Sequence, residues 1–418
     1  KFRYTYEYNL TTPSLEKNII YTSRYSYNII IHKNNLYKLL NMIPTITLFN
    51  NKPAVEVGNE KIQLTILMGG GHIAAVKIPG NKINPLWEPP WITTTPAMRR
   101  IVARNFSQSE EDRLESELLA CIGGHNLCCD VFGSHSKGEV NAGASFHGEA
   151  GLTTWEVTDI NETNGSLTMK AHLIRTQMVV ERIYTPDQNN NPCITIVERI
   201  TNLLNVERAI GRSQHVTLGR EILEKTSGIC RFDCNGDKGL TWPEVADKSS
   251  TFKCNEKFDY PNIPLKKISE ESSDEKNCDW RKYPRNDVNS DLCTLRINPN
   301  DKFGWFTCAK DIIDNNNKSL FLIYKWERNV FPWLMSWEEN FAREVKPWSS
   351  KTLTRGLEFG SYAMALGRRW NVETNKLFDT LCYEWIDANE MKETSFTIGM
   401  KECVNSDEEN QFKNMVLK

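Results

Sequence analysis

Three short stretches of the sequence carry side chains suited to proton transfer. His147 lies in a glycine-rich segment, His215 follows a strand-like run, and Glu358 stands between Leu357 and Phe359. Histidine exchanges its proton near neutral pH, and a glutamate desolvated by apolar neighbours becomes a stronger base. These residue types therefore predict general acid–base chemistry. The plainer alternatives are a satisfied core histidine for His147 and a glutamate that points outward from a strand edge for Glu358.

The surroundings of His147 favour a site over a core position. Phe146 supplies an aromatic wall that excludes water, while Gly143, Gly148 and Gly151 allow the backbone to approach closely. His147 and His215 stand about 70 residues apart and converge only if the fold brings their strands to one face.

In chain order, these stretches resemble the aldose 1-epimerase (galactose mutarotase-like) superfamily, most closely its glucose-6-phosphate 1-epimerase-like branch. In that branch a Gly-Gly-x-Pro-x-Cys-x-Pro-x-Phe-Gly segment precedes a His-Gly-Phe-Ala-Arg motif. Here residues 123–133 read Gly-Gly-His-Asn-Leu-Cys-Cys-Asp-Val-Phe-Gly, and residues 147–151 read His-Gly-Glu-Ala-Gly. A strand that ends in the His215 motif and a glutamate near the C-terminus, Glu358, follow in the family's order. The resemblance spans about residues 55–400.

This resemblance implies ring opening and closing at the anomeric carbon of a free sugar. By position, Glu358 would take the proton from the anomeric hydroxyl and His215 would protonate the ring oxygen. His147 would orient or polarise the same region. Because the same two groups serve both half-reactions in reverse, neither a cofactor nor a metal is required.

The sequence departs from the sugar-phosphate branch where that branch carries arginines. Ile122 and Gly151 stand in their places, and arginine is the usual bidentate phosphate clamp. His125 and Asn126 replace more apolar residues and are expected, with Gln214, to bind sugar hydroxyls. The expected ligand is therefore an unphosphorylated, neutral carbohydrate, and its size stays open toward larger ones.

Tryptophans offer stacking surfaces for sugar rings. Trp87 and Trp91 enclose two prolines and would form a rigid aromatic lip, while Trp333 and Trp337 precede Glu358 and would form the opposite wall. For any one of them the alternative is an ordinary core tryptophan.

Residues 233–244 imitate a calcium-binding loop, with oxygen side chains at several of the offsets of an EF-hand. Lys238 occupies the position that needs glycine, and flanking helices are missing, so we predict no metal site. The same loop, with Glu244, is instead expected to reach over the sugar.

Composition limits the other partners. The chain has 51 basic and 53 acidic residues and a net charge of −2, which argues against nucleic-acid binding. No apolar run approaches the length of a membrane span, and no signal peptide is visible, so the expected location is cytoplasmic. The oligomeric state is not predicted.

Many short runs rich in Val, Ile and Thr, separated by Asn, Asp, Gly and Pro, predict an all-β fold, a large antiparallel β-sandwich with few short helices. Only residues 107–120 have a clear helical pattern. We expect an extension at 1–50, a sandwich domain at 51–405 with a polar loop excursion at about 230–300, and a tail at 406–418.

Two further functions stay open at this stage, because a fold does not fix a function. The first is a carbohydrate-binding protein without catalysis on the same scaffold. The second is a relative of glycoside hydrolases or lyases, which would need another carboxylate or a Tyr or Lys base opposite Glu358.

Overall fold

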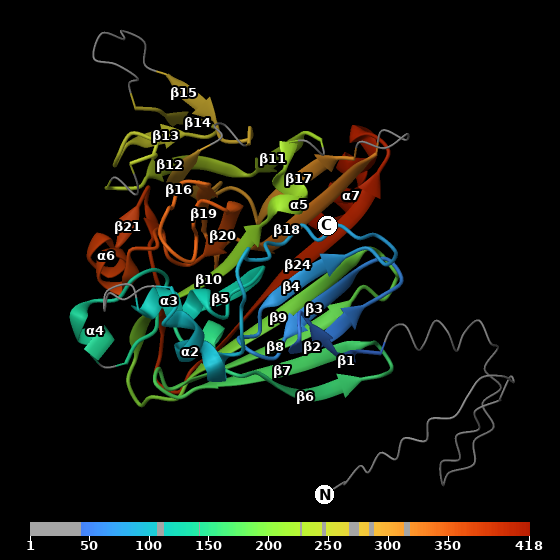
Figure 1. Cartoon of the computed structure of the whole chain (residues 1–418), viewed down its shortest axis with the longest axis horizontal. Coiled ribbons are helices and arrows are strands. Elements are labelled where there is room, and N and C mark those ends of the chain that lie inside the picture. Colours follow the sequence, from blue (N-terminus) through green and yellow to red (C-terminus); the bar gives the residue numbers. More distant parts are fainter. Residues whose placement is uncertain are drawn as a thin grey trace, which may run out of the picture.

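The computed structural model describes residues 43–106, 113–141, 143–225, 228–244, 248–266, 276–283, 288–312 and 318–418. Strands dominate these residues and form two large antiparallel sheets (Figure 1). The predicted all-β sandwich is confirmed. Most of the expected extension at 1–50 lies outside the described residues, but its last part forms strand β1 (Thr45–Phe49), which pairs with β2 (Lys52–Gly58).

The twelve-stranded sheet has the order β1-β2-β3-β4-β5-β10-β20-β19-β16-β12-β13, with β23 paired to β10 off this path. Its remaining strands are β3 (Gln63–Leu67), β4 (Ile73–Lys77), β5 (His125–Asp130), β10 (Arg208–Leu218), β12 (Gly236–Thr241), β13 (Lys257–Asp259), β16 (Asn289–Ile297), β19 (Trp333–Asn340), β20 (Leu353–Gly360) and β23 (Glu384–Ile386).

The eight-stranded sheet has the order β11-β17-β18-β24-β9-β8-β7-β6. Its strands are β6 (Glu156–Asn161), β7 (Ser166–Leu173), β8 (Met178–Pro186), β9 (Cys193–Asn202), β11 (Cys230–Cys234), β17 (Phe303–Asp311), β18 (Ser319–Glu327) and β24 (Met391–Cys403). Two small hairpins complete the strands: β14 (Asn262–Pro264) with β15 (Asn277–Asp279), and β21 (Lys376–Leu377) with β22 (Thr380–Leu381).

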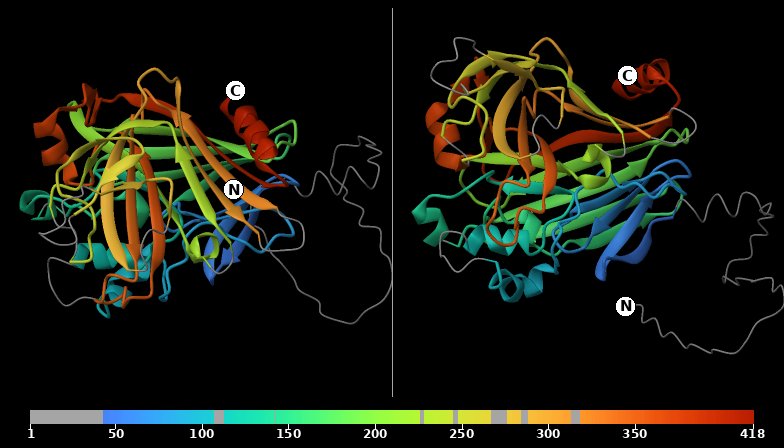
Figure 2. Two further views of the ribbon diagram at one scale, coloured as in Figure 1. Left: turned by 90° about the horizontal axis from the view of Figure 1, so that it is seen from above. Right: turned by 45° about the horizontal axis from the view of Figure 1, so that its top comes forward.

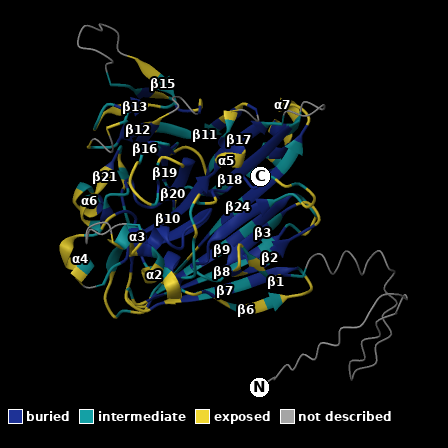
Figure 3. Ribbon diagram, viewed as in Figure 1, coloured by how far each residue is buried: buried dark blue, intermediate teal, exposed yellow. Residues whose placement is uncertain are grey.

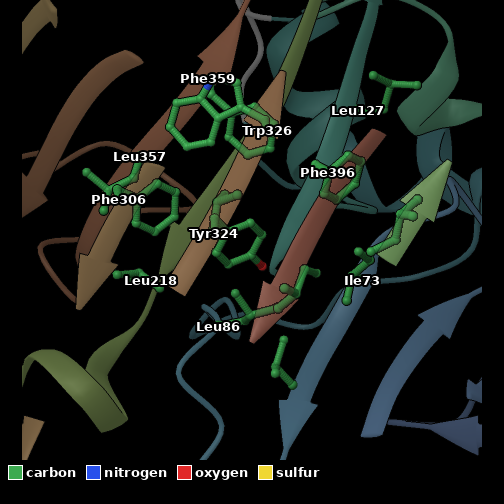
Figure 4. Packing of buried hydrophobic residues seen from close by; sticks show 14 of the residues in the cluster. Ile73, Leu86, Leu127, Leu218, Phe306, Tyr324, Trp326, Leu357, Phe359 and Phe396 are labelled. Carbon is green, nitrogen blue, oxygen red and sulfur yellow. The ribbon is translucent and has the colours of Figure 1, made fainter. Parts of the chain in front are cut away.

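The core lies between the two large sheets. Trp326 of β18 stacks on Phe359 of β20, with ring centroids 4.3 Å apart, and Tyr324 and Phe396 pack beside them (Figure 4). Alternation along β20 follows from this packing, because Leu357 and Phe359 face the other sheet and Glu358 must face away. The central strands are buried while exposed residues gather on helices and turns (Figure 3).

Helices cover the periphery. The α-helices are α2 (Arg99–Ala103), α3 (Arg113–Leu119), α4 (Lys137–Asn141), α5 (Arg220–Leu223), α6 (Gly367–Thr374) and α7 (Ser406–Leu417), and two 3-10 turns are η1 (Pro96–Met98) and η2 (Ala150–Leu152). The predicted helix at 107–120 corresponds to α3, and residues 107–112 lie outside the described part. Residues 406–418, expected as a tail, form α7, which buries Phe412 and Val416.

The described residues between 230 and 300 differ from the expected loop excursion, because they supply strands to both sheets. β11 joins the eight-stranded sheet, while β12, β13 and β16 extend the twelve-stranded one at the end away from β6 and β7 (Figures 1 and 2). Among the described residues, no helix is long and apolar enough to span a bilayer.

Candidate active site

Glu358 and His215 lie side by side on neighbouring strands. β10 and β20 pair antiparallel in a register that sets His215 directly opposite Glu358, and directly opposed residues share a face of the sheet. The His215 Nε2 and Glu358 Oε1 atoms are 3.1 Å apart, with side chains only 7% and 2% exposed. The His215 Nδ1 lies 3.0 Å from the Thr217 hydroxyl. Strand register therefore places the two side chains together, and the Thr217 hydroxyl holds the His215 ring through its other nitrogen.

His147 joins this pair from a loop between β5 and β6. Its backbone has a φ of 58°, an uncommon conformation for a residue with a side chain. Two hydrogen bonds hold it there: the Gly133 amide donates to the His147 Nδ1 at 2.9 Å, and the His147 amide donates to the Gly133 carbonyl at 3.2 Å. The His147 ring lies 5.3 Å from the His215 ring. All three residues predicted to be catalytic thus converge.

A neutral imidazole carries one proton. Because the His147 Nδ1 accepts a hydrogen bond from the Gly133 amide, its proton must sit on Nε2. His147 lines the cavity and therefore offers its Nε2 as a hydrogen-bond donor, which suits an oxygen atom of a ligand.

His147, His215 and Glu358 open into a cavity of about 260 Å³ on the outer face of the twelve-stranded sheet. This volume is slightly below the range for small-molecule sites, roughly 300–1,000 Å³. The aromatic side chains that line it are Trp87, Phe132, Phe146, Trp242, Trp337 and Trp348. Flat apolar surfaces beside a few polar groups are typical of a site for one small, uncharged molecule.

Burial controls the protonation of the three residues. It raises the pKa of Glu358 well above its ordinary value and lowers the pKa of His215 to about 4. Burial, and then the charges of His215 and His135, hold the pKa of His147 well below its ordinary range. Since charge is disfavoured on each partner, the His215–Glu358 pair holds one proton between Nε2 and Oε1.

Gly356 makes room for the Glu358 carboxylate. The two residues share a face of β20, and a Cβ atom at position 356 would lie 2.4 Å from the Glu358 Oε1 and 3.3 Å from the Trp337 ring. The carboxylate therefore occupies the space that a side chain at position 356 would take.

The structure places His125 and Gln214 away from the cavity. Both face the space between the sheets, where the His125 Nε2 lies 3.0 Å from the Gln214 Oε1. Gln214 also accepts from Arg182 and donates to Glu198, so the four form a buried polar network. Asn126 shares the face of His215, its cross-strand partner, but it does not line the cavity; its Oδ1 is buried without a partner among the described residues.

The predicted tryptophans divide in the same way. Trp87 lines the cavity, and the Trp91 ring packs edge-to-face against the Trp87 ring, with centroids 5.4 Å apart. Trp333 lies outside the cavity and donates from its Nε1 to the Leu381 carbonyl. Trp337, predicted as part of the opposite wall, does line the cavity.

The loop that imitates a calcium site reaches the cavity through a different residue from the one predicted. Glu244 is exposed and outside the cavity, whereas Trp242 is part of its wall. The carboxylates of Asp233 and Asp237 are occupied by Tyr260 and Arg296. This segment therefore contributes an aromatic wall.

Sequence reasoning missed Arg343 and Trp348 at the cavity. Arg343 forms ion pairs with Glu115 of α3 at 3.1 Å and with Glu339 of β19 at 3.2 Å, and its guanidinium lies 4.8 Å from the Trp348 ring centre. Both residues come from the connection between β19 and β20, where no periodic pattern marks them. Only the acidic residues Glu339 and Glu344 around Arg343 hint at an ion pair.

No protein-family model matches the sequence, and no curated protein matches it. The fold does match solved structures. A candidate aldose 1-epimerase from Klebsiella pneumoniae superposes with a TM-score of 0.57 at 11% identity over 90% of this chain and 86% of its own. A galactose mutarotase-like protein from Clostridium acetobutylicum gives 0.51 at 10% identity over 86% and 98%, and a protein from Synechocystis gives 0.50 at 13% over 85% and 99%. The chain therefore has the galactose mutarotase-like β-sandwich fold.

Proposed function

We propose that the protein is an aldose 1-epimerase-like enzyme that interconverts the anomers of a free, uncharged sugar. The observation that carries the proposal is the His215–Glu358 pair, 3.1 Å apart at the floor of a small aromatic cavity, with His147 beside it. Two oxygens bonded to one carbon, as O1 and O5 are in a pyranose, are close enough for such a pair to reach both.

The chemistry needs one proton taken and one given. In the reacting form the shared proton lies on the His215 Nε2, so that an imidazolium, whose Nδ1 hydrogen-bonds the Thr217 hydroxyl, faces an ionised Glu358 carboxylate. Glu358 then removes the proton from the O1 hydroxyl, the C1–O5 bond breaks as the C1=O1 bond forms, and His215 delivers its Nε2 proton to O5. After the C1–C2 bond rotates, the reverse steps close the ring on the other face of the aldehyde. His147 donates from Nε2 to an oxygen of the reacting region and polarises it. The pair returns to its starting protonation after each cycle.

Local charge supports an uncharged substrate. Arg343 is the arginine in the cavity wall, and two carboxylates, Glu115 and Glu339, already neutralise it. Ile122, which replaces an arginine of the sugar-phosphate branch, lines the cavity, while the other such position, Gly151, accepts a hydrogen bond from His72 and lies outside it. Among the described residues of the cavity wall, a phosphate group therefore finds no surplus positive charge.

Exchange NMR between the α- and β-anomeric protons of neutral monosaccharides tests the proposal. We expect the wild-type protein to accelerate exchange, Glu358→Gln to lower the rate by about 10²–10⁴-fold, and the exposed control Glu162→Gln to match wild type. Binding of sugars without exchange would instead support the non-catalytic carbohydrate-binding protein. That alternative is favoured by the small exposure of His215 and Glu358.

A further inference from the structure

The place of Arg343 in the cavity follows from strand β19. Met335 is the cross-strand partner of Glu358, and Trp337 and then Glu339 follow on the same face of the strand. Alternate residues of a strand lie roughly 7 Å apart, so Glu339 lies two such steps from the row that holds Glu358. The Arg343 Nε lies 3.2 Å from the Glu339 Oε2, and its guanidinium carbon lies 5.9 Å from the Trp337 ring centre. The acid–base pair and the guanidinium therefore stand on either side of Trp337.

Arg343 and Glu115 form a polar pair with unused hydrogen-bonding capacity. The Arg343 Nη1 donates to the Glu115 Oε1 at 3.1 Å, and the two side chains are 29% and 32% exposed. Among the described residues, neither the Arg343 Nη2 nor the Glu115 Oε2 has a hydrogen-bond partner. Donors and an acceptor thus lie side by side, and a hydroxyl group, which donates and accepts, can use both.

The guanidinium is held in place before a ligand arrives. Glu339 Oε1 accepts from the backbone amides of Ala342 and Arg343 at 3.0 and 2.9 Å, which fixes the carboxylate that pairs with Arg343. On the other side, the guanidinium carbon lies 4.8 Å from the Trp348 ring centre. A group that is already ordered costs less to use in binding.

The charges at this end of the cavity favour hydroxyls over anions. Arg343 faces two carboxylates, Glu115 and Glu339, so an anionic ligand meets more negative than positive charge. A neutral hydroxyl avoids that repulsion, and its hydrogen bonds to charged groups are stronger than those to neutral ones.

The proposed reaction decides which hydroxyls come to this end. Glu358 and His215 act on O1 and O5, so the C1–O5 bond of the ring must face them. In a six-membered ring, the bond opposite C1–O5 is C3–C4. A pyranose that lies along Trp337 therefore directs O3 and O4 away from the acid–base pair and toward Arg343.

We infer that Arg343 and Glu115 bind the C3 and C4 hydroxyls of the sugar and so determine which sugars the cavity accepts. This inference rests on the proposed function and assigns specificity to two residues that take no part in the proton transfers.

Arg343→Met tests the role of the guanidinium, because methionine removes the donors and keeps an unbranched side chain against the tryptophans. A contact made equally in the ground state and the transition state changes KM and leaves kcat unchanged. We therefore expect KM for anomer exchange to rise about tenfold, as for a lost hydrogen bond to a charged group. The control is Arg369→Met on α6, where Arg369 is 79% exposed, and it should match wild type. A fall in kcat with unchanged KM would contradict the inference.

Deoxy sugars identify the hydroxyls that the pair contacts. The parent is D-glucose or D-galactose, whichever wild type binds more tightly, and it is compared with its 2-deoxy, 3-deoxy and 4-deoxy analogues. Wild type should lose about tenfold in kcat/KM on the 3-deoxy or the 4-deoxy sugar. Arg343→Met should not show that loss, because the partner of the hydroxyl is already gone. The 2-deoxy sugar is the control, and its effect should be the same in both proteins.

Glu115→Met is expected to lose this discrimination for at least one of the two hydroxyls. Discrimination that persists in either variant would contradict the role of the residue replaced. A purely structural role for Arg343 would weaken all four sugars by one common factor, and that result would overturn the inference.

Dissociation constants from saturation-transfer difference NMR separate this inference from the proposed function. If no sugar shows exchange, but removing O3 or O4 weakens binding in wild type and not in Arg343→Met, the specificity pair stands and the epimerase activity fails. If exchange occurs and each deoxy sugar is weakened equally in both proteins, the activity stands and the specificity pair fails.

Discussion

Replacing Gly356 with alanine is expected to damage the reaction while sparing the fold. The new Cβ would lie 2.4 Å from the Glu358 Oε1, and an ordinary contact needs about 3.4 Å, so the carboxylate oxygen must move by about 1 Å. A displacement of that size in a catalytic group costs roughly 10²-fold in rate. We therefore expect kcat/KM for anomer exchange to fall by about 10²-fold.

The fold should tolerate the same change, because the atom that must move is the end of a flexible side chain. The backbone of Gly356 does not have a positive φ, so alanine fits its conformation, and replacing glycine at a compatible position typically adds about 0.4–1 kcal/mol of stability. Thermal unfolding should show a Tm equal to or slightly above that of wild type.

Gly123→Ala is the matched control, since a Cβ at that position meets no atom within 4 Å. The NMR shifts of the His215 ring nitrogens give a readout independent of turnover, because displacement of the carboxylate weakens the 3.1 Å contact. A Gly356→Ala protein with kcat/KM within twofold of wild type and unchanged His215 shifts would refute this reasoning.

Three further changes follow from the geometry. Glu115→Gln removes one of the two carboxylates paired with Arg343, so a sugar phosphate should inhibit anomer exchange severalfold more strongly. The double variant Glu115→Gln/Arg343→Met should show no such increase in inhibition. An equal increase in the double variant would contradict the charge argument. Trp337→Ala should raise KM for the sugar, because Trp337 lines the cavity, whereas Trp333→Phe should leave KM near wild type. Equal increases in KM for the two variants would contradict the assignment of only Trp337 to the cavity wall. Burial lowers the pKa of His72 from 6.5 to about 4. As the pH falls below 6.5, the imidazole of His72 therefore binds a proton in the unfolded chain but not in the folded protein. The folded protein loses stability between pH 6.5 and about 4 for this reason. His72→Gln should reduce the stability difference between pH 7 and pH 5 by about 2 kcal/mol, measured by urea unfolding, and an undiminished difference would place the acid sensitivity elsewhere.

The sequence predicted the sandwich because many short β-type runs separated by turn residues are compatible with few folds other than a β-sandwich or barrel. The three residues proposed to be catalytic came from a family resemblance in chain order. Strand register then explains why two of them converge, since His215 and Glu358 are direct partners on β10 and β20.

His125 and Asn126 show why the other predicted binding residues could not be assigned to the cavity from the sequence. Neighbouring residues in a strand point to opposite sides, so a shift of one residue in register exchanges them. The pairing of β5 with β10 sets Asn126 opposite His215 and turns His125 into the core, and no pattern in the sequence fixes that pairing.

Non-local contacts limited the prediction elsewhere. Arg343 and Trp348 lie in the irregular connection between β19 and β20. Arg343 is held at the cavity by its ion pair with Glu115, and Trp348 by its ring contact with Trp337. The strands within residues 230–300 are mostly three to six residues long, and such short runs among polar residues resemble loops until partner strands are known.

A double-mutant cycle on the proposed acid–base pair tests the central claim most directly. The rate measured is anomer exchange of a neutral free sugar, for wild type, His215→Gln, Glu358→Gln and the double variant. Groups that act as one unit are strongly non-additive. We therefore expect wild type to accelerate exchange, each single variant to lose most of that acceleration, and the double variant to be no slower than the slower single one. Exchange that wild type does not accelerate, or losses that multiply in the double variant, would contradict the account of His215 and Glu358 as a pair sharing one proton.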